Sequence, residues 1–167
     1  NARLGKSNWA VVEADESDGS FTRLPATIAV VTNIDAEHME HYGDFESLYG
    51  AFRHFVRNVP FYGLGVLCVD HPVVKKLSQE IDDRRIVTYG FDSNADVCAT
   101  NIRFCSNGAT FDIVMKPDYL EKQRELTGCM GENVATLPAV LKDVYLPMVG
   151  QHNVQNALSV VAIAQEL

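Results

Sequence analysis

The stretch that decides the fold is WAVVEADESDGSF, residues 9–21. Its first four residues, 9–12, are apolar and rich in β-branched side chains, which is typical of a buried strand. The run then breaks into four acids within six residues: Glu13, Asp15, Glu16 and Asp18. In open α/β sheets the carboxyl ends of the strands face the ligand crevice. We therefore expect a buried strand that delivers carboxylates to a site.

A second apolar run, Ile28 to Val31, ends in a similar way. It passes into TNIDAEHMEHYGDF, residues 32–45, which contains Asn33, Asp35 and His38. Two strands that release polar groups toward one edge indicate a site for a cation such as Mg²⁺, which prefers oxygen ligands. The alternative is a pair of solvated turns in which Asp and Ser cap the following helices.

Composition narrows the classes of protein. A chain of 167 residues, 47% of them hydrophobic, can form one domain with a core. A net charge of -8 argues against a nucleic-acid partner. No apolar stretch approaches the roughly 20 residues of a membrane span, so we expect no membrane partner either. The four cysteines show no C-x-x-C spacing, which predicts reduced thiols in a cytoplasmic protein.

The two ends of the chain indicate that it is part of something longer. It starts at Asn1 without Met, and the opening NARLGKSNW lacks the apolar centre of a secretory signal. A helical pattern over residues 154–167 runs to the last residue with no Gly or Pro after it. We therefore expect flanking segments in the parent protein.

Strand and helix patterns alternate through the middle of the chain. An amphipathic helix is predicted over 45–59, after Asp44 as N-cap. It is followed by a strand over 63–70, a short helix from 71 to about 81 and a strand over 85–89. This alternation predicts an α/β fold with a mostly parallel sheet flanked by helices.

The pattern changes after Asp96. Alternating segments over 97–104 and 109–115 surround Ser106-Asn107-Gly108, and Asn-Gly between two such runs is a strong hairpin signal. We therefore expect a small antiparallel sheet appended to the parallel one. Residues 117–143 resemble a loop or insertion, with a strand returning near 144–148.

Three motifs resemble, in order and spacing, the central ATP-binding domain of the Mur ligases: EADESDGSF at 13–21, TNIDAEHMEHYGDF at 32–45 and VGQHNVQNAL at 149–158. The similarity covers nearly the whole chain and is weakest over 117–143. It implies that 1–167 is part of that domain: an α/β core over 1–95, an antiparallel sheet and loop over 96–148, and an adenine-side loop and helix over 149–167.

The resemblance also implies a reaction. Within the family, the chain most resembles the branch that joins L-alanine to UDP-N-acetylmuramate in peptidoglycan synthesis. In that reaction ATP phosphorylates the carboxylate of UDP-N-acetylmuramate, and the amine of L-alanine then displaces phosphate to form an amide. Catalysis of phosphoryl transfer depends on metal ions and positioned donors. The implied cofactors are therefore ATP and Mg²⁺.

Three residues of the first two motifs match positions of the family's catalytic site. Glu13 matches a metal-binding glutamate and His38 a metal-binding histidine, while Asn33 lies in the substrate-facing loop. Imidazole is a poorer ligand than oxygen for Mg²⁺, so the assignment of His38 depends on the resemblance. Glu37 occupies a position where the family more often has Asp, and the extra methylene alters how the neighbouring ligand is oriented.

The third motif matches the family's adenine side, through His152, Asn153 and Asn156. An amide offers both a donor and an acceptor, which suits the N6 and N7 edge of adenine. The alternative is that the two asparagines cap the last helix.

The chain also departs from the family. No G-x-x-x-x-G-K-[ST] phosphate loop occurs in it, and the amino- and carboxyl-terminal domains of the family are missing, so we expect this chain alone to be inactive. Three alternatives stay open: a related ligase of the murein tripeptide or folylpolyglutamate type, a non-catalytic nucleotide-binding module, and a metal-dependent hydrolase. The hydrolase would use Glu13, Asp15, His38 and His41.

Overall fold

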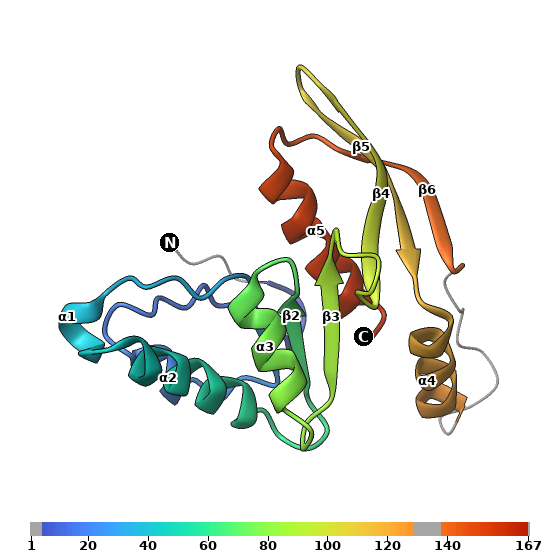
Figure 1. Ribbon diagram of the computed structural model, residues 1–167. Coiled ribbons are helices and arrows are strands. Elements are labelled where there is room, and N and C mark those ends of the chain that lie inside the picture. The colour runs from blue at the N-terminus through green and yellow to red at the C-terminus, as the bar shows by residue number, and fades with distance from the viewer. Residues whose placement is uncertain (1–4, 129–137, 167) are drawn as a thin grey trace.

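Figure 1 shows the computed structural model, which describes residues 5–128 and 138–166. Six strands form one sheet in the order β1 to β6. The strands are β1 Ile28–Val31, β2 Leu64–Cys68, β3 Ile86–Gly90, β4 Val97–Cys105, β5 Gly108–Met115 and β6 Val140–Leu146. The helices are the 3-10 turn η1 Ser20–Arg23, α1 Met39–Tyr42, α2 Phe45–Arg57, α3 Pro72–Glu80, α4 Pro117–Gly128 and α5 Gln151–Ala164.

The sheet combines a parallel and an antiparallel part. Strands β1 to β4 pair in parallel, and β4, β5 and β6 pair antiparallel. The two parts are continuous, because Tyr89 and Gly90 of β3 pair with Val97 and Cys98 of β4. The predicted fold class is confirmed, and the antiparallel strands extend the parallel sheet.

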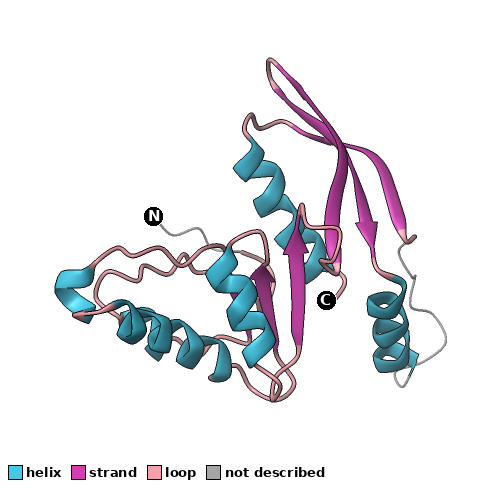
Figure 2. Cartoon of the chain, viewed as in Figure 1, coloured by secondary structure: helices cyan, strands magenta, loops and turns pink. Residues whose placement is uncertain are grey.

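Helices cover both faces of the parallel part (Figure 2). Helices α2 and α3 pack on one face, where Leu67 of β2 points, and α5 packs on the other, where Val66 and Cys68 point. All five residues of β2 are buried. A strand buried on both faces needs apolar side chains in both directions, which explains why β2 is an uninterrupted apolar run.

Several predicted elements are confirmed with small shifts in their bounds. Helix α2 starts after Asp44, whose side chain accepts a hydrogen bond from the Ser47 N–H at 2.7 Å. Such a cap satisfies one of the free amides of the first turn. The hairpin turn at Ser106 and Asn107 joins β4 to β5. Helix α5 begins at Gln151, three residues before the predicted start at 154.

Residues 117–143 contain more regular structure than the sequence suggests. Pro117 is the first residue of helix α4, a position where proline is favoured because its missing N–H would have no partner. Strand β6 begins at Val140, earlier than the predicted return near 144. The interpretation of this stretch as a loop is wrong for the part that the structure describes, and residues 129–137 lie outside it.

The prediction of a buried strand over 9–12 is wrong. These residues belong to neither a helix nor a strand, and Val11 is fully exposed at 100% of its surface. Every strand among the described residues lies after residue 27, and 9–12 pairs with none of them, although β1 at the edge of the sheet pairs only with β2. An apolar β-branched run becomes a strand only when a ladder satisfies its backbone groups.

Two features bear on the environment of the protein. Within 5–128 and 138–166, each helix is too short or too polar to cross a bilayer.

Cys68 and Cys98 are buried free thiols, and Cys105 is an exposed one, whereas Cys129 lies outside the described residues. Burial raises the pKa of the Cys68 and Cys98 thiols, which disfavours the reactive thiolate.

An ion pair between α3 and the loop after β3 makes stability depend on pH. Lys75 Nζ lies 2.6 Å from Asp92 Oδ2, and this contact, with the N–H of Asn94, lowers the pKa of Asp92 from 3.8 to about 2. A carboxylate with a depressed pKa stabilises the folded state above its unfolded pKa, and this contribution is lost as pH falls through the folded pKa.

We predict that Asp92→Asn lowers the free energy of unfolding at pH 7 and has little effect near pH 2. The reason is that about half of the wild-type carboxylate is protonated near pH 2, so most of the stabilisation by its charge is already lost. Urea unfolding followed by circular dichroism at pH 7, 4 and 2 measures the difference. Asp82→Asn, at an exposed aspartate, is the matched control. A difference that stays constant from pH 7 to pH 2 would contradict the assignment.

Candidate functional site

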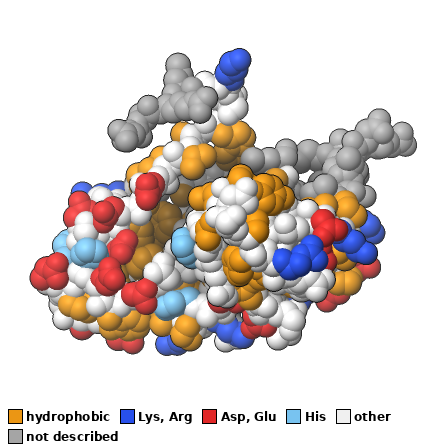
Figure 3. Space-filling view, turned by 90° about the horizontal axis from the view of Figure 1, so that it is seen from above, with side chains coloured by type: hydrophobic (Ala, Val, Ile, Leu, Met, Phe, Trp, Pro, Cys, Tyr) orange, Lys and Arg blue, Asp and Glu red, His pale blue; other side chains and the backbone are white. Residues whose placement is uncertain are grey.

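The two acidic loops predicted from the sequence lie next to each other. One contains residues 13–19 and the other residues 32–38, which follow β1. Figure 3 shows acidic and histidine side chains gathered on one side of the molecule. A pocket of about 400 Å³ lies here, lined by Glu13, Ala14, Asp15, Glu16 and His38. The structure therefore brings Glu13 and His38, both predicted from the sequence, to one pocket.

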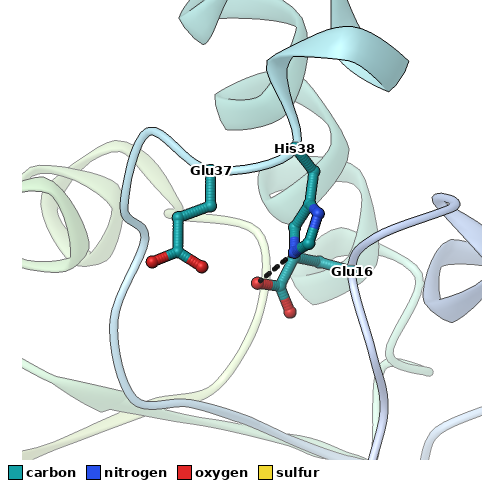
Figure 4. A group of neighbouring side chains, drawn as sticks. All are labelled: Glu16, Glu37 and His38. Carbon is teal, nitrogen blue, oxygen red and sulfur yellow. Dashed lines mark ion pairs between the residues drawn. The ribbon is translucent and has the colours of Figure 1, made fainter.

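The closest group of potential metal ligands is Glu16, Glu37 and His38 (Figure 4). One ligand atom from each residue lies within 4.8 Å of the other two. His38 Nε2 lies 3.9 Å from Glu16 Oε1, and both side chains are half-buried. Sequence reasoning placed Glu16 in the acidic run and noted Glu37, but assigned neither as a ligand of the same ion as His38.

Local hydrogen bonds hold the loop that carries Glu16. The carboxylates of Asp15 and Asp18 accept from the N–H groups of Ser17 and Ser20, at 2.7 and 2.9 Å. Such Asx turns fix the direction of the chain without help from a sheet. Hydrogen bonds with the side chains of Ser17 and Ser20, and then those with their N–H groups, lower the pKa of Asp15 and of Asp18, so both side chains stay charged. The loop therefore presents its charge in a defined shape.

Tyr42 joins this loop to helix α1. Its hydroxyl donates a hydrogen bond to the carbonyl oxygen of Glu16. Burial raises the pKa of Tyr42, and the negative charges of Glu16, Asp18 and Asp15 raise it further, so the hydroxyl keeps its proton and its role as donor.

His38 has an unusual backbone conformation. Its φ is 55°, in the left-handed region that few residues other than glycine adopt, and it lies at the start of α1. Its ring lies between two carboxylates, with Nδ1 3.9 Å from Glu40 and Nε2 3.9 Å from Glu16. Strained backbone of this kind is concentrated at functional sites.

His41, which the hydrolase alternative requires as a second ligand, is placed differently. Its ring packs edge-on against the ring of Tyr42, with 4.8 Å between centroids. Within the described part of the chain, the group of ligand atoms formed by Glu16, Glu37 and His38 does not include it. The arrangement therefore does not provide the pair of histidines that this alternative needs.

Asn33 belongs to a neighbouring network. Its amide nitrogen donates to Asp35 Oδ2 at 2.6 Å, and Asp35 Oδ1 lies 3.2 Å from His71 Nε2. The hydrogen bond from Asn33, and then that with His71, lowers the pKa of Asp35. The loop after β1 is thus tied to the start of α3. The sequence carried no signal for His71, because the contact depends on how β1 and β2 are aligned.

The third motif forms the first turns of α5. His152 and Asn156 are exposed, and Asn153 is half-buried with its amide nitrogen donating to the Val149 carbonyl at 2.8 Å. An N-cap side chain accepts from a backbone N–H, so this bond is not a cap. The residue at the cap position is Gly150, at φ 112°. Two exposed side chains are thus presented at the start of a helix.

Comparison with known proteins identifies the family. Residues 2–164 match the sequence model described as the Mur ligase middle domain. The chain belongs to this family. It is 50% identical over all 167 residues to the UDP-N-acetylmuramate--L-alanine ligase of Roseobacter denitrificans and 53% identical to that of Sinorhizobium medicae. The chain spans only 32% of the length of either relative.

Solved structures share the fold of this Mur ligase domain. MurF from Acinetobacter baumannii matches with a TM-score of 0.64 at 22% identity, covering 92% of this chain and 28% of that one. UDP-N-acetylmuramate-alanine ligase from Thermotoga maritima matches with a TM-score of 0.62 at 20% identity, covering 89% of this chain and 27% of that one. At these identities the likeness shows the fold.

We predict that the pocket binds a divalent cation at His38. Mn²⁺ is a suitable probe because it broadens nearby NMR signals, and the ring signals of His38 should broaden before those of His54 on α2. Removing one carboxylate with Glu16→Gln should weaken binding by about 10-fold, since carboxylates are the preferred ligands. Asp82→Asn removes the same charge far from the group. Equal weakening by both substitutions would mean that only the overall charge attracts the ion.

Proposed function

We propose that this chain is the central, nucleotide-binding part of an ATP-dependent ligase that joins L-alanine to UDP-N-acetylmuramate in peptidoglycan synthesis. The observation that carries the proposal is the pocket in which Glu13, Glu16 and His38 meet, formed by two loops that bear family motifs. Identities of 50% and 53% to enzymes named for this reaction, over the whole chain, support the choice of substrates.

In the proposed reaction, the γ-phosphoryl group of ATP passes to the carboxylate of UDP-N-acetylmuramate. The bond to ADP breaks, and an acyl phosphate forms. The amine of L-alanine then attacks the acyl carbon, and the tetrahedral intermediate expels phosphate to leave an amide. Charge on the transferring phosphoryl group must be stabilised at the pocket.

The donors in the pocket suit Mg²⁺. Carboxylate oxygens are the ligands that Mg²⁺ prefers, and Glu16 and Glu37 each offer one within 4.8 Å of the other ligand atoms of the group. Glu13, in the same pocket, supplies a further carboxylate. We assign Glu13 and His38 as metal-binding residues, with Glu16 and Glu37 beside them. When bound, the ion would neutralise phosphate charge.

The negative charge of the pocket requires a cation if ATP is to bind there. The chain has a net charge of -8, and acids dominate both loops. An ATP molecule without a cation would be repelled by this field. Hydrogen bonding keeps Asp15, Asp18 and Asp35 ionised, so the repulsion persists at neutral pH.

We assign the adenine side of the nucleotide site to His152, Asn153 and Asn156. The exposed side chains of His152 and Asn156 are available to a ligand, and the Asn156 amide matches both the donor and the acceptor of the adenine edge. The Asn153 amide nitrogen already donates to Val149, so its oxygen is the atom offered to the base. The domains that complete the ligase, and a cytoplasmic location, are part of the same proposal. Asn33, held by Asp35, is assigned to the substrate-facing loop.

In the intact ligase, Glu13→Ala should lower kcat by about 100-fold or more and His38→Ala by about 10-fold, because a carboxylate is the harder, charged ligand. Turnover measured across a Mg²⁺ titration separates the two effects. His54→Ala, on α2 beside Asn58, is the control and should behave as wild type. A Glu13→Ala enzyme with wild-type turnover and Mg²⁺ dependence would refute the metal assignment.

Asn153→Ala or Asn156→Ala should raise the KM for ATP by about 10-fold, within the 1–3 kcal/mol cost of a lost buried hydrogen bond. The KM for UDP-N-acetylmuramate should stay unchanged, because the proposed partner is the adenine. Steady-state kinetics with ATP and with GTP provide the test. If the substitutions raise the KM for ATP and the KM for GTP equally, the two side chains do not recognise adenine.

A further inference from the structure

A partly buried polar contact connects helix α5 to the sheet. Asp70 lies two residues after β2, and its Oδ1 accepts hydrogen bonds from the backbone N–H groups of Phe91 and Asp92, both at 2.9 Å. Its Oδ2 accepts from the Phe91 N–H at 2.8 Å and from the Gln155 side chain at 2.5 Å. One carboxylate thus joins the loops after two parallel strands to a helix 85 residues away in the sequence.

The backbone around this carboxylate is shaped to receive it. Gly90, the last residue of β3, is buried and has a φ of 154°. A Cβ at this position would lie 2.5 Å from Asp70 Oδ1. The absence of a side chain is therefore what allows Asp70 to reach the amides beyond β3.

Gln155 lies in the middle of the motif assigned to adenine. It is two residues after Asn153 and one before Asn156, on the first turns of α5. The buried side chains Val154 and Leu158 pack this helix against the sheet. Apolar packing supplies much of the force that holds the helix on the sheet, but it is non-directional and fixes no polar atom of the first turns. A short hydrogen bond to a fixed carboxylate does fix one.

We propose that Asp70 and Gln155 are a positioning pair that sets the register of the first turns of α5, and so aims His152 and Asn156 at the nucleotide base. This inference rests on the proposed function, because it takes the start of α5 to be the adenine side. Neither Asp70 nor Gln155 touches the nucleotide in this proposal. They act by fixing the positions of His152 and Asn156, the side chains that contact the base in this proposal.

Gln155→Met tests the pair in the intact ligase, because methionine has a similar length and lacks the amide donor. We expect the KM for ATP to rise about 10-fold, with kcat and the KM for UDP-N-acetylmuramate within twofold of wild type. Gln165→Met, at the other end of α5, is the matched control. It removes an amide that donates to Met115 Sδ and should leave the KM for ATP unchanged.

An exchange of donor and acceptor gives a second, independent measurement. Gln155→Glu alone places two carboxylates together and should raise the KM for ATP at least as much as Gln155→Met. Asp70→Asn combined with Gln155→Glu restores one donor and one acceptor with the total charge unchanged. The double variant should recover most of the wild-type KM for ATP, which shows that the two residues act through their contact with each other.

The outcomes separate this inference from the proposed function. If Asn156→Ala raises the KM for ATP and Gln155→Met does not, the positioning pair is overturned and the adenine assignment stands. If neither raises it, both are overturned. Equal effects of Gln155→Met and Gln165→Met, equal effects on both substrates, or failure of the double variant to recover would each overturn the positioning pair.

Discussion

Parallel pairing of β1, β2 and β3, with helices on both faces, leaves few places where polar side chains can gather. The faces are filled by apolar packing, so charged groups are confined to the ends of the strands. At the carboxyl ends the chain leaves β1 for the loop of Asn33 and His38, and leaves β2 for Asp70 and His71. The site is thus a consequence of how the core is covered.

Charge at this edge acts in two opposed ways. Clustered carboxylates repel one another and repel phosphates, which costs stability and weakens nucleotide binding. The same carboxylates provide the oxygen ligands that a divalent cation prefers. Hydrogen bonds from Ser17, Ser20 and Asn33 keep three of the aspartates ionised, so local structure maintains the charge. The arrangement therefore suits a nucleotide that arrives together with a cation.

Much of the fold could be predicted because its signals are local. Asp44 caps α2, and the turn before Gly108 closes the hairpin, as the sequence indicates. The strand predicted over 9–12 failed because a ladder needs a partner, which the apolar pattern cannot supply. Helix α4 was missed because 117–143 resembles a loop or insertion in sequence, although Pro117 is at a helix start, where proline is favourable.

The site was predictable in its location but not in its partners. Two acidic motifs placed Glu13 and His38 at one pocket, whereas the closeness of Glu16, Glu37 and His38 depends on turn geometry. The φ of 55° at His38 and the bonds that shape residues 15–20 determine which side chains meet. The bond between Gln155 and Asp70 spans 85 residues, so it becomes visible only once the strand order is known.

The two parts of the proposed nucleotide site are supported in different ways. The acidic loops are held by short-range hydrogen bonds and by Tyr42, and most of their side chains are exposed. Helix α5 is held by core packing and by the partly buried contact of Gln155 with Asp70. Exposed side chains on these loops can adjust when phosphates and a cation enter, whereas recognition of a base by two or three side chains needs a rigid support. A site that combines charge neutralisation with base recognition benefits from this division, because each task receives the support that it needs.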